Sequence, residues 1–335
     1  MSHRCVLFGL IAGGPCRATG WLDSEDTRAS LDAVRALGAG VAHEGDQVTV
    51  TPPADAPHED VTIDCGNSGT TARLLLGILA GWLDPEGGAV TLTGDASLST
   101  RPMNRVVKPL RTMGADIKFV GEEGRLPIRV RGAKLTAGHH DLEVPSAQVK
   151  SALLLAGLFA KGRTTIGGAG SSRDHTELML GQMGVSCEPK AGETGVGLDG
   201  PSRPGGLDMR VPGDPSSAAF FQVAAALVPG SRVTATGMSL NHTRTGALRT
   251  LKKAGVSVAI ERPFGDPRGE TAGDVVVSHK ALQPFTLDAQ DIPSQVDEIP
   301  VLAVLATQAG GATVISGAED LRVKESDRLA LMAAN

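Results

Sequence analysis

The chain has 335 residues, of which 41% are hydrophobic and 3% aromatic, and its formal net charge is −5. This composition predicts a globular protein that is long enough for two domains. Nucleic-acid binding is not expected, because the chain has no overall positive field and few rings on which bases could stack. The sequence contains no apolar run of about 18 residues that could cross a membrane and no signal-peptide pattern, so we expect a cytoplasmic protein.

An apolar helix followed by a glycine and a short β-branched strand recurs five times along the chain. The expected helices are 2–14, 69–81, 147–162, 216–230 and 297–311, and the strands are 17–22, 89–94, 163–168, 232–237 and 312–317. A polar turn and a second helix follow each strand. Four of these second helices end at a glycine that fits the C′ position, where φ is positive; these are Gly38, Gly114, Gly184 and Gly255. The pattern predicts an α/β protein built from repeated βαβαβ units of about 70 residues, with right-handed crossovers that pack helices against a sheet.

A segment rich in Gly and Pro, 191–206, precedes the fourth helix and predicts a domain boundary near Gly206. We expect three repeat units in residues 1–206 and about two of three in residues 207–335. The first unit lacks a strand before its helix, and the last helix lacks the usual stop signals. Both ends therefore look cut relative to a complete set of repeats.

Polar residues concentrate at the predicted helix starts. Free N–H groups and the positive end of the helix dipole favour phosphate and carboxylate there. The turn GNSGTTAR (66–73) resembles a phosphate cradle without the Lys-Ser/Thr of a Walker A motif; a plain N-cap by Ser68 or Thr70 is the alternative. Arg101 precedes a proline that suits a first helical turn, and a surface arginine is the alternative.

The remaining helix starts carry further candidates. PSAQVKS (145–151) and SSRDHTE (171–177) suit substrate binding, with capping as the alternative. Asp297 and Glu298 precede a strongly apolar helix, where acids are common for dipole reasons alone. RVKESDR (322–328) mixes acids and bases, which could tune a proton donor or acceptor; a solvated face is the alternative.

The four cysteines, Cys5, Cys16, Cys65 and Cys187, are scattered without CxxC or Cys/His metal spacing. We expect free thiols in a reducing compartment and no metal site. His175 has no second ligand at a useful spacing, so it is not interpreted as a metal ligand.

These motifs together resemble the 5-enolpyruvylshikimate-3-phosphate synthase family, and SAQVKSALLLAGL and SRDHTE are most similar to its class II bacterial members. The resemblance covers essentially the whole chain. It implies the two-domain enolpyruvyl transferase fold, with repeats around pseudo-threefold axes and an incomplete second domain. It also implies transfer of the enolpyruvyl group of phosphoenolpyruvate to the 5-hydroxyl of shikimate 3-phosphate, with release of phosphate, in aromatic amino-acid biosynthesis. No cofactor or metal is implied.

The resemblance assigns roles to particular residues. Shikimate 3-phosphate would contact Arg4, Ser146, Ala147, Gln148, Ser172, Arg173 and Lys324. Phosphoenolpyruvate would contact Gly69, Arg101, Gln148 and Arg328. Asn67 and Thr70 of the turn at 66–73 complete the expected substrate-binding set. Asp297 would be the base near the 5-hydroxyl, and Glu325 the proton-transfer partner at the methylene carbon. Ala147 stands where some members have a serine, so one hydroxyl contact is in question.

Relative to the family, a Lys-Ser before Ser2 and a later Asp-His-Arg stretch and lysine are missing. We therefore expect weak or no activity of this chain alone, together with exposed apolar surface and oligomerisation or instability. Gly69 leaves room in the phosphoenolpyruvate site, so a protein with restored ends should be sensitive to glyphosate. Two alternatives stay open. One is the enolpyruvyl transferase acting on UDP-N-acetylglucosamine, which uses a loop cysteine such as Cys16. The other is a non-catalytic anion-binding fragment.

Overall fold

The structure is a computed structural model that describes residues 1–335 except 171, 193–194, 267–268 and 324–325, and except the side chain of residue 323. The chain forms two compact units. Unit 1 comprises Met1–Gly170 and Asp174–Val211, and unit 2 comprises Pro212–Asn335 together with Ser172 and Arg173. The predicted boundary at Gly206 falls before the end of unit 1, because the strand that follows it, Leu207–Arg210, pairs with strand Cys16–Thr19.

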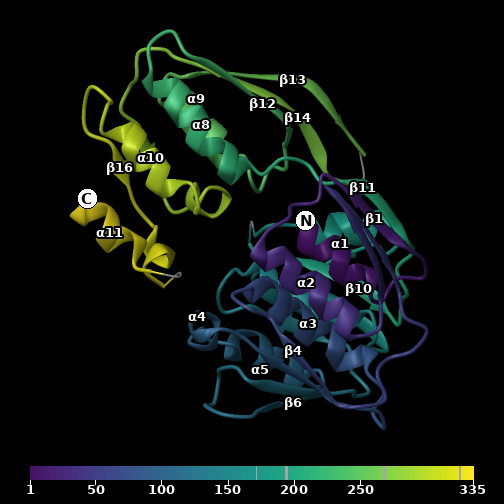
Figure 1. Cartoon of the computed structure of the whole chain (residues 1–335). Coiled ribbons are helices and arrows are strands. Elements are labelled where there is room, and N and C mark those ends of the chain that lie inside the picture. Colours follow the sequence, from purple (N-terminus) through teal and green to yellow (C-terminus); the bar gives the residue numbers. More distant parts are fainter. Residues whose placement is uncertain (171, 193–194, 267–268, 324–325) are drawn as a thin grey trace. The chain divides into compact units, whose positions relative to one another are not determined.

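Unit 1 contains all three of the repeats expected before the boundary (Figure 1). Its helices are α1 (Ser2–Gly9), α2 (Glu25–Ala36), α3 (Gly69–Trp82), α4 (Ala96–Ser99), α5 (Asn104–Thr112), α6 (Ala147–Gly157) and α7 (His175–Gln182). Its strands are β1 (Cys16–Thr19), β2 (Gly40–Glu44), β3 (Gln47–Thr51), β4 (Val61–Asp64), β5 (Val90–Thr93), β6 (Asp116–Phe119), β7 (Ile128–Arg131), β8 (His139–Asp141), β9 (Gly162–Gly167), β10 (Val196–Gly200) and β11 (Leu207–Arg210). The predicted helices and strands of these repeats are confirmed; α1 and α6 end earlier than expected, α3 is one residue longer, and the strands are shifted or shortened by one to three residues at their ends.

Each repeat of unit 1 contributes one small sheet. The strand orders are β11-β1-β3-β2, β4-β5-β7-β6 and β10-β9-β8. Every sheet has one parallel pair (β1 with β11, β4 with β5, β8 with β9), and its other pairs are antiparallel. Each sheet therefore combines a parallel pair, as expected for a crossover unit, with antiparallel pairs that the repeat pattern did not predict.

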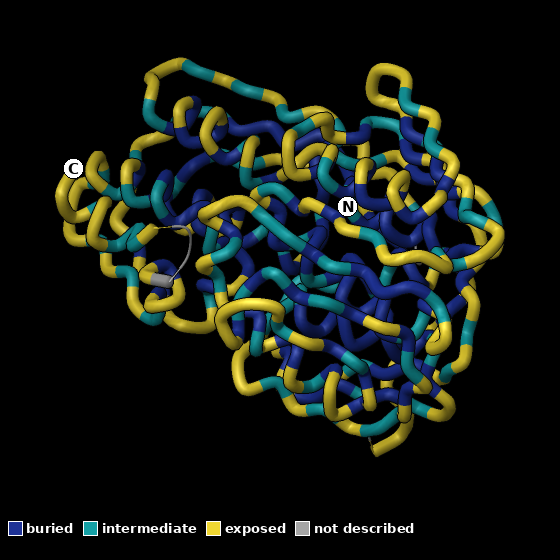
Figure 2. The backbone as a smooth tube through the Cα atoms, turned by 60° about the horizontal axis from the view of Figure 1, so that its bottom comes forward, coloured by how far each residue is buried: buried dark blue, intermediate teal, exposed yellow. Residues whose placement is uncertain are grey.

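The apolar helices α1, α3 and α6 form the interior of unit 1. Figure 2 shows the buried segments, in dark blue, enclosed by exposed ones in yellow. Small residues allow α3 and α6 to approach closely. A Cβ at Gly77 would overlap the backbone of Ala152, and a Cβ at Gly81 would lie 2.5 Å from Cβ of Phe159. This packing places the start of α3 beside the start of α6, because both helices run from polar N-termini into the same core.

The four glycines predicted to end the second helices are confirmed in that role. Gly38, Gly114, Gly184 and Gly255 follow the C-cap residues of α2, α5, α7 and α9 (Gly246–Lys253), and their φ angles are +89°, +97°, +86° and +84°. Glycine adopts this left-handed conformation without the steric cost of a Cβ.

Unit 2 has a core of its own, built from the fourth and fifth repeats. Its helices are α8 (Pro215–Leu227), α9, α10 (Ile299–Ala306) and α11 (Arg328–Ala334), with 3-10 turns η1 (Ile292–Ser294) and η2 (Glu319–Val323). Its strands are β12 (Arg232–Ser239), β13 (Ser257–Gly265), β14 (Thr271–Ser278), β15 (Thr286–Leu287) and β16 (Val314–Ile315), in the orders β12-β14-β13 and β15-β16.

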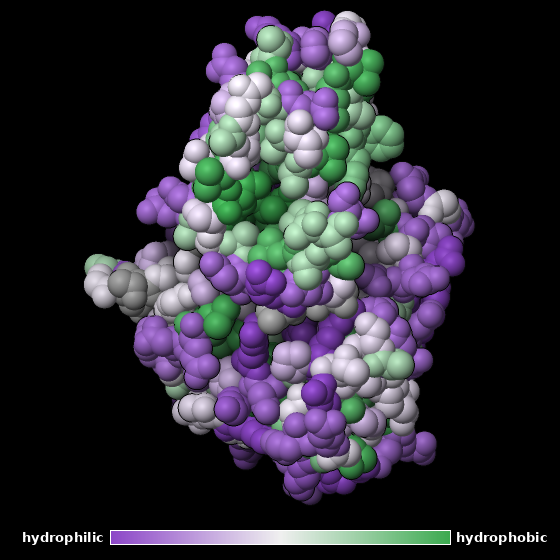
Figure 3. All heavy atoms as spheres, turned by 90° about the vertical axis from the view of Figure 1, so that its left-hand side faces the viewer, coloured by the Kyte–Doolittle hydropathy of each residue, from purple (hydrophilic) through white to green (hydrophobic). Residues whose placement is uncertain are grey.

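Unit 2 also exposes large apolar side chains, and hydrophobic surface is visible on it in Figure 3. Phe220 and Phe221 on α8 are 61% and 68% exposed. Such surface agrees with the expectation of exposed apolar area in this part of the chain.

Candidate functional site

The turn at 66–73 builds the N-terminus of α3. Ser68 is the N-cap and accepts a hydrogen bond from the backbone N–H of Thr71 at 3.2 Å. Of the two capping candidates, Ser68 therefore takes this role. Asn67 donates from Nδ2 to Asp95 at 2.7 Å, which leaves its Oδ1 directed at Arg101.

Arg101 lies at this helix tip and is not an isolated surface arginine. Its Nη2 donates to Asn67 Oδ1 at 2.5 Å and to Ser97 Oγ at 3.4 Å. The expectation that Pro102 occupies a first helical turn is wrong, since α5 begins at Asn104 with Met103 as its N-cap. Arg101 instead lies in the segment between α4 and α5. Asp95, the N-cap of α4, accepts a hydrogen bond from Asn67, and this contact places the segment next to Asn67.

Gly69 opens the first turn of α3 between two guanidinium groups. A Cβ at Gly69 would lie 3.1 Å from Arg73 Nη1 and 3.5 Å from Arg101 Nη1. Such a contact with Arg73 is tighter than ordinary van der Waals packing, so the two cations approach the bare backbone at this point. A helix N-terminus with two guanidinium groups favours an anion.

Gln148 joins the start of α6 to the same tip. Its Oε1 accepts from Arg73 Nη1 at 2.6 Å, and its Nε2 donates to Thr70 Oγ1 at 2.9 Å. Ser146 is the N-cap of α6 and accepts from the backbone N–H of Val149 at 3.4 Å, and Ala147 is the first helical residue. The predicted residues of unit 1 around α3 and α6 are thus brought together.

Arg4 marks a second position in unit 1, where α1, α6 and α7 meet. Its guanidinium is buried and donates from Nε to Thr176 Oγ1 at 2.7 Å and from Nη2 to Ser151 Oγ at 3.2 Å. The next residues on the two helices, Lys150 and Glu177, form an ion pair of 2.5 Å. The alternative reading of the α7 start as a capping box is not supported, because the N-cap Asp174 makes no capping hydrogen bond with its side chain.

His3, the neighbour of Arg4, is held neutral by its surroundings. Burial lowers the pKa of His3 to about 3, and the charge of Arg4 acts in the same direction. The ring nitrogen Nδ1 lies 2.9 Å from Ser30 Oγ. An unfolded histidine titrates near 6.5, so the unfolded state takes up a proton first as the pH falls.

We therefore expect His3 to contribute to acid sensitivity. Its contribution to stability is present above pH 6.5 and is lost as the pH falls toward 3. Between pH 8 and pH 5 the free energy of unfolding should fall by about 2 kcal/mol more in the wild type than in His3→Asn. Chemical denaturation at the two pH values measures this difference, and equal losses in the two proteins would contradict it.

In unit 2, Asp297 lies between two arginines. Its Oδ2 accepts from Arg173 Nη2 at 2.5 Å, and its Oδ1 accepts from Arg328 Nη1 at 3.3 Å. Ser172 precedes Arg173 in the same unit. The two cations hold the Asp297 carboxylate, which is about 31% exposed, in a defined direction.

The structure describes part of the motif at 322–328. Lys324 and Glu325, the latter a predicted catalytic residue, lie outside the described residues. Asp327 caps α11 by accepting from the backbone N–H of Ala330 at 2.9 Å, and it pairs with Arg322 at 3.1 Å. The backbone hydrogen bond and Arg322 lower the pKa of Asp327.

Two residues at these positions were missed by the prediction. Arg73 orients Gln148, and Glu298 is buried beside Asp297 with its carboxylate 2.5 Å from Ser216 Oγ. Burial raises the pKa of Glu298, while Ser216 and Arg244 oppose the shift. Arg73 could have been found as the last residue of the turn motif, whereas nothing in the sequence distinguishes Glu298 from an ordinary acid of a first helical turn.

The cysteines of the chain are buried thiols. Burial raises the pKa of Cys16 to about 11, and those of Cys5, Cys65 and Cys187 to about 12. Cys16 lies in β1 with no exposed surface. It is therefore not a reactive loop cysteine, because a nucleophilic thiol needs access and a lowered pKa.

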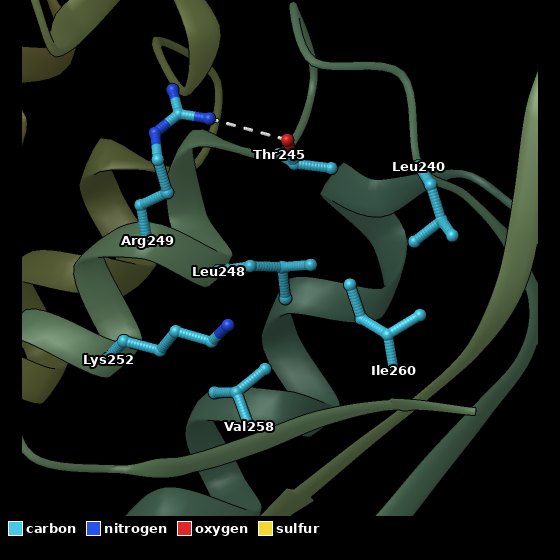
Figure 4. A pocket seen from close by; sticks show the side chains of 7 residues that line it. All are labelled: Leu240, Thr245, Leu248, Arg249, Lys252, Val258 and Ile260. Carbon is cyan, nitrogen blue, oxygen red and sulfur yellow. Dashed lines mark hydrogen bonds between the residues drawn. The ribbon is translucent and has the colours of Figure 1, made fainter. Parts of the chain in front are cut away.

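A pocket of about 140 Å³ lies in unit 2 between α9 and β13 (Figure 4). It is lined by Leu240, Thr245, Leu248, Arg249, Lys252, Val258 and Ile260. None of the predicted site residues lines it. Over the described ranges of the chain, no group of three potential metal ligands occurs, and no helix is long and apolar enough to cross a membrane.

Known proteins match this chain over nearly its whole length. The sequence profile of EPSP synthase (3-phosphoshikimate 1-carboxyvinyltransferase) matches residues 1–335. The 3-phosphoshikimate 1-carboxyvinyltransferases of Anaeromyxobacter sp. (strain K) and Shouchella clausii (strain KSM-K16) are 48% and 44% identical to it. The alignments cover 99% and 98% of this chain, and 74% and 75% of those proteins.

A solved EPSP synthase structure from Acinetobacter baumannii gives the same answer at the level of the fold. It superposes with a TM-score of 0.86 at 38% sequence identity, over 99% of this chain and 74% of that one. The agreement of sequence and fold over essentially the whole chain means that the protein is a member of the EPSP synthase (3-phosphoshikimate 1-carboxyvinyltransferase) family.

Proposed function

We propose that this chain transfers the enolpyruvyl group of phosphoenolpyruvate to the 5-hydroxyl of shikimate 3-phosphate in the cytoplasm, in the shikimate pathway of aromatic amino-acid biosynthesis. The observation that carries the proposal is Asp297, an aspartate held between Arg173 and Arg328. A general base needs a fixed direction, which the two arginines give to the Asp297 carboxylate, and the same cations attract the anionic substrates.

The reaction has an addition and an elimination step. The 5-hydroxyl oxygen attacks C2 of phosphoenolpyruvate, its proton passes to Asp297, and the methylene carbon takes a proton from Glu325. Loss of a proton from the new methyl group then re-forms the double bond as phosphate leaves. These assignments follow the family resemblance. The contacts of Asp297 support them, while Glu325 lies outside the described residues.

In unit 1, we assign the tip of α3 to phosphoenolpyruvate. The guanidinium groups of Arg73 and Arg101 lie against Gly69, and the amide oxygen of Gln148 accepts from Arg73. Asn67 and Thr70 support this group by bonding Arg101 and Gln148. The carboxylate and phosphate of phosphoenolpyruvate both suit this environment.

Shikimate 3-phosphate is assigned to Arg4, to Ser146, Ala147 and Gln148 at the start of α6, and to Ser172, Arg173 and Lys324. Arg4 supports this assignment because its guanidinium is already oriented by hydroxyls on α6 and α7. Ala147 offers only its backbone N–H, because its side chain lacks the hydroxyl of the serine that some family members have at this position.

The test is release of inorganic phosphate by the purified protein. Because residues of the family pattern are missing, we expect slow release, and only when both shikimate 3-phosphate and phosphoenolpyruvate are present. We expect no release when UDP-N-acetylglucosamine replaces shikimate 3-phosphate. The buried Cys16 argues against that second acceptor. Calorimetric binding of shikimate 3-phosphate without phosphate release would instead favour the non-catalytic anion-binding alternative.

Gly69→Ala tests the phosphoenolpyruvate assignment. The added methyl group would lie 3.1 Å from Arg73 Nη1, so this guanidinium must shift by a few tenths of an ångström and the methyl group occupies space at the tip. We expect KM for phosphoenolpyruvate to rise about tenfold and that for shikimate 3-phosphate to change by less than about twofold. Gly138→Ala is the matched control, since a Cβ there meets nothing within 4 Å. Equal changes in both KM values would contradict the assignment, and the same pair of variants shows whether glyphosate inhibition depends on this space.

A further inference from the structure

Glu298 is a buried carboxylate that the proposed reaction does not use. It is only 2% exposed and is the N-cap residue of α10, but its side chain does not cap that helix. Instead its Oε1 accepts a hydrogen bond from Ser216 Oγ on α8 at 2.5 Å. Burial of a carboxylate costs free energy of folding unless hydrogen bonds replace its lost hydration.

The hydrogen bonds continue beyond Ser216 in one direction. Arg244 Nη2 donates to Ser216 Oγ at 2.8 Å and to Asp214 Oδ1 at 2.6 Å. Asp214 is the N-cap of α8 and accepts from the backbone N–H of Ser217 at 2.9 Å. Arg244 can only donate, so the Ser216 hydroxyl accepts from Arg244 and donates its own proton to Glu298. The direction of each hydrogen bond in this network is therefore defined.

This hydrogen-bond network joins the starts of three helices. Ser216 is in the first turn of α8, Arg244 lies just before the N-cap of α9, and Glu298 is the N-cap of α10. Asp297 is the next residue back along the chain from Glu298, so its backbone is fixed where Glu298 is fixed. Its carboxylate then reaches Arg173 and Arg328.

We propose that Glu298 is a positioning residue for Asp297, and that the hydrogen bonds from Arg244 through Ser216 to Glu298 set the direction of the Asp297 carboxylate. This inference rests on the proposed function, in which Asp297 accepts the proton of the 5-hydroxyl. Small errors in the placement of a general base lower kcat strongly, because proton transfer requires hydrogen-bond distance in the transition state.

Two substitutions of similar size separate positioning from stability. Glu298→Gln keeps an oxygen that accepts from Ser216, whereas Glu298→Met removes it and leaves an apolar side chain of similar volume. We expect Glu298→Gln to keep kcat within about threefold of the wild type and Glu298→Met to lower it about tenfold or more, with KM for phosphoenolpyruvate within about threefold in both. Glu298→Met loses one hydrogen bond from Ser216, so its melting temperature should fall by about 2–4 °C at most, too little to lower kcat at 25 °C.

Ser216→Ala breaks the same hydrogen-bond network at Ser216, and it provides a second test if Glu298→Met does not fold. It should lower kcat to a similar extent, and the double variant Ser216→Ala/Glu298→Met should lose little more than either single variant. Glu261→Gln, an exposed acid on β13, is the control and should have wild-type kinetics. Wild-type kcat in Glu298→Met or in Ser216→Ala would overturn the proposal, as would losses that add.

A structural measurement that does not depend on catalytic activity distinguishes this proposal from the proposed function. In a crystal structure of Glu298→Met, we expect the Asp297 carboxylate to be displaced from Arg173. An unchanged Asp297–Arg173 contact would overturn the positioning role even if the wild type were inactive. Conversely, a wild type that releases no phosphate while Asp297 moves in the variant would overturn only the proposed function.

Discussion

Replacement of Asp297 by asparagine is expected to lower kcat for phosphate release by about 10²–10⁴-fold. The substitution keeps the size of the side chain and an oxygen that can accept from Arg173, but the amide cannot take up the proton of the attacking hydroxyl. The ion pairs with Arg173 and Arg328 are weakened as well. Steady-state kinetics with both substrates measure the loss.

The matched control for this prediction is Asp291→Asn in the same unit. Asp291 pairs with Lys253 at 2.9 Å away from the Asp297 cluster, and we expect its substitution to change kcat by less than about twofold. If Asp297→Asn retained more than about a tenth of the wild-type kcat, Asp297 would not be the base. Another residue would then have to accept the proton of the 5-hydroxyl.

The second large effect is expected on stability, at the buried ion pair between Lys150 on α6 and Glu177 on α7. Their side chains are 3% and 10% exposed, and the ion pair is 2.5 Å long. Burial raises the pKa of Glu177, and the charge of Lys150 opposes that shift. Glu177→Leu removes the carboxylate that pairs with the buried Lys150 ammonium. We expect the free energy of unfolding to fall by about 3–5 kcal/mol.

The double variant Lys150→Met/Glu177→Leu distinguishes a lost ion pair from a packing defect. Removal of both charges should restore most of the stability, because apolar residues of similar volume often replace a buried pair without loss. Arg35→Met is the surface control. Its ion pair with Asp32 is solvent-exposed and should matter by less than about 1 kcal/mol. Urea denaturation gives all four values, and a double variant as unstable as Glu177→Leu would contradict the prediction.

Local structure could be predicted from the sequence because it depends on short-range chemistry. The alternation of apolar helix, glycine and β-branched strand located α3 and α6, and the four C′ glycines were identified from their place after each second helix. Ser68 was one of two capping candidates because a hydroxyl before a helix accepts from its free N–H groups. The family could be identified for the same reason, since its motifs are short and lie at helix starts.

The arrangement of side chains between repeats depends on tertiary packing. Sequence separation hides the contacts of Arg73 with Gln148 and of Glu298 with Ser216, which lie 75 and 82 residues apart. The bare backbone of Gly77 against Ala152 decides the first, and the packing of α8 against α10 decides the second. The sequence by itself determined which segments are helices, which residues are candidates to cap them and which residues carry charge. Only the folded chain decided which charges are buried and paired, because burial is a property of neighbours that the local sequence does not contain.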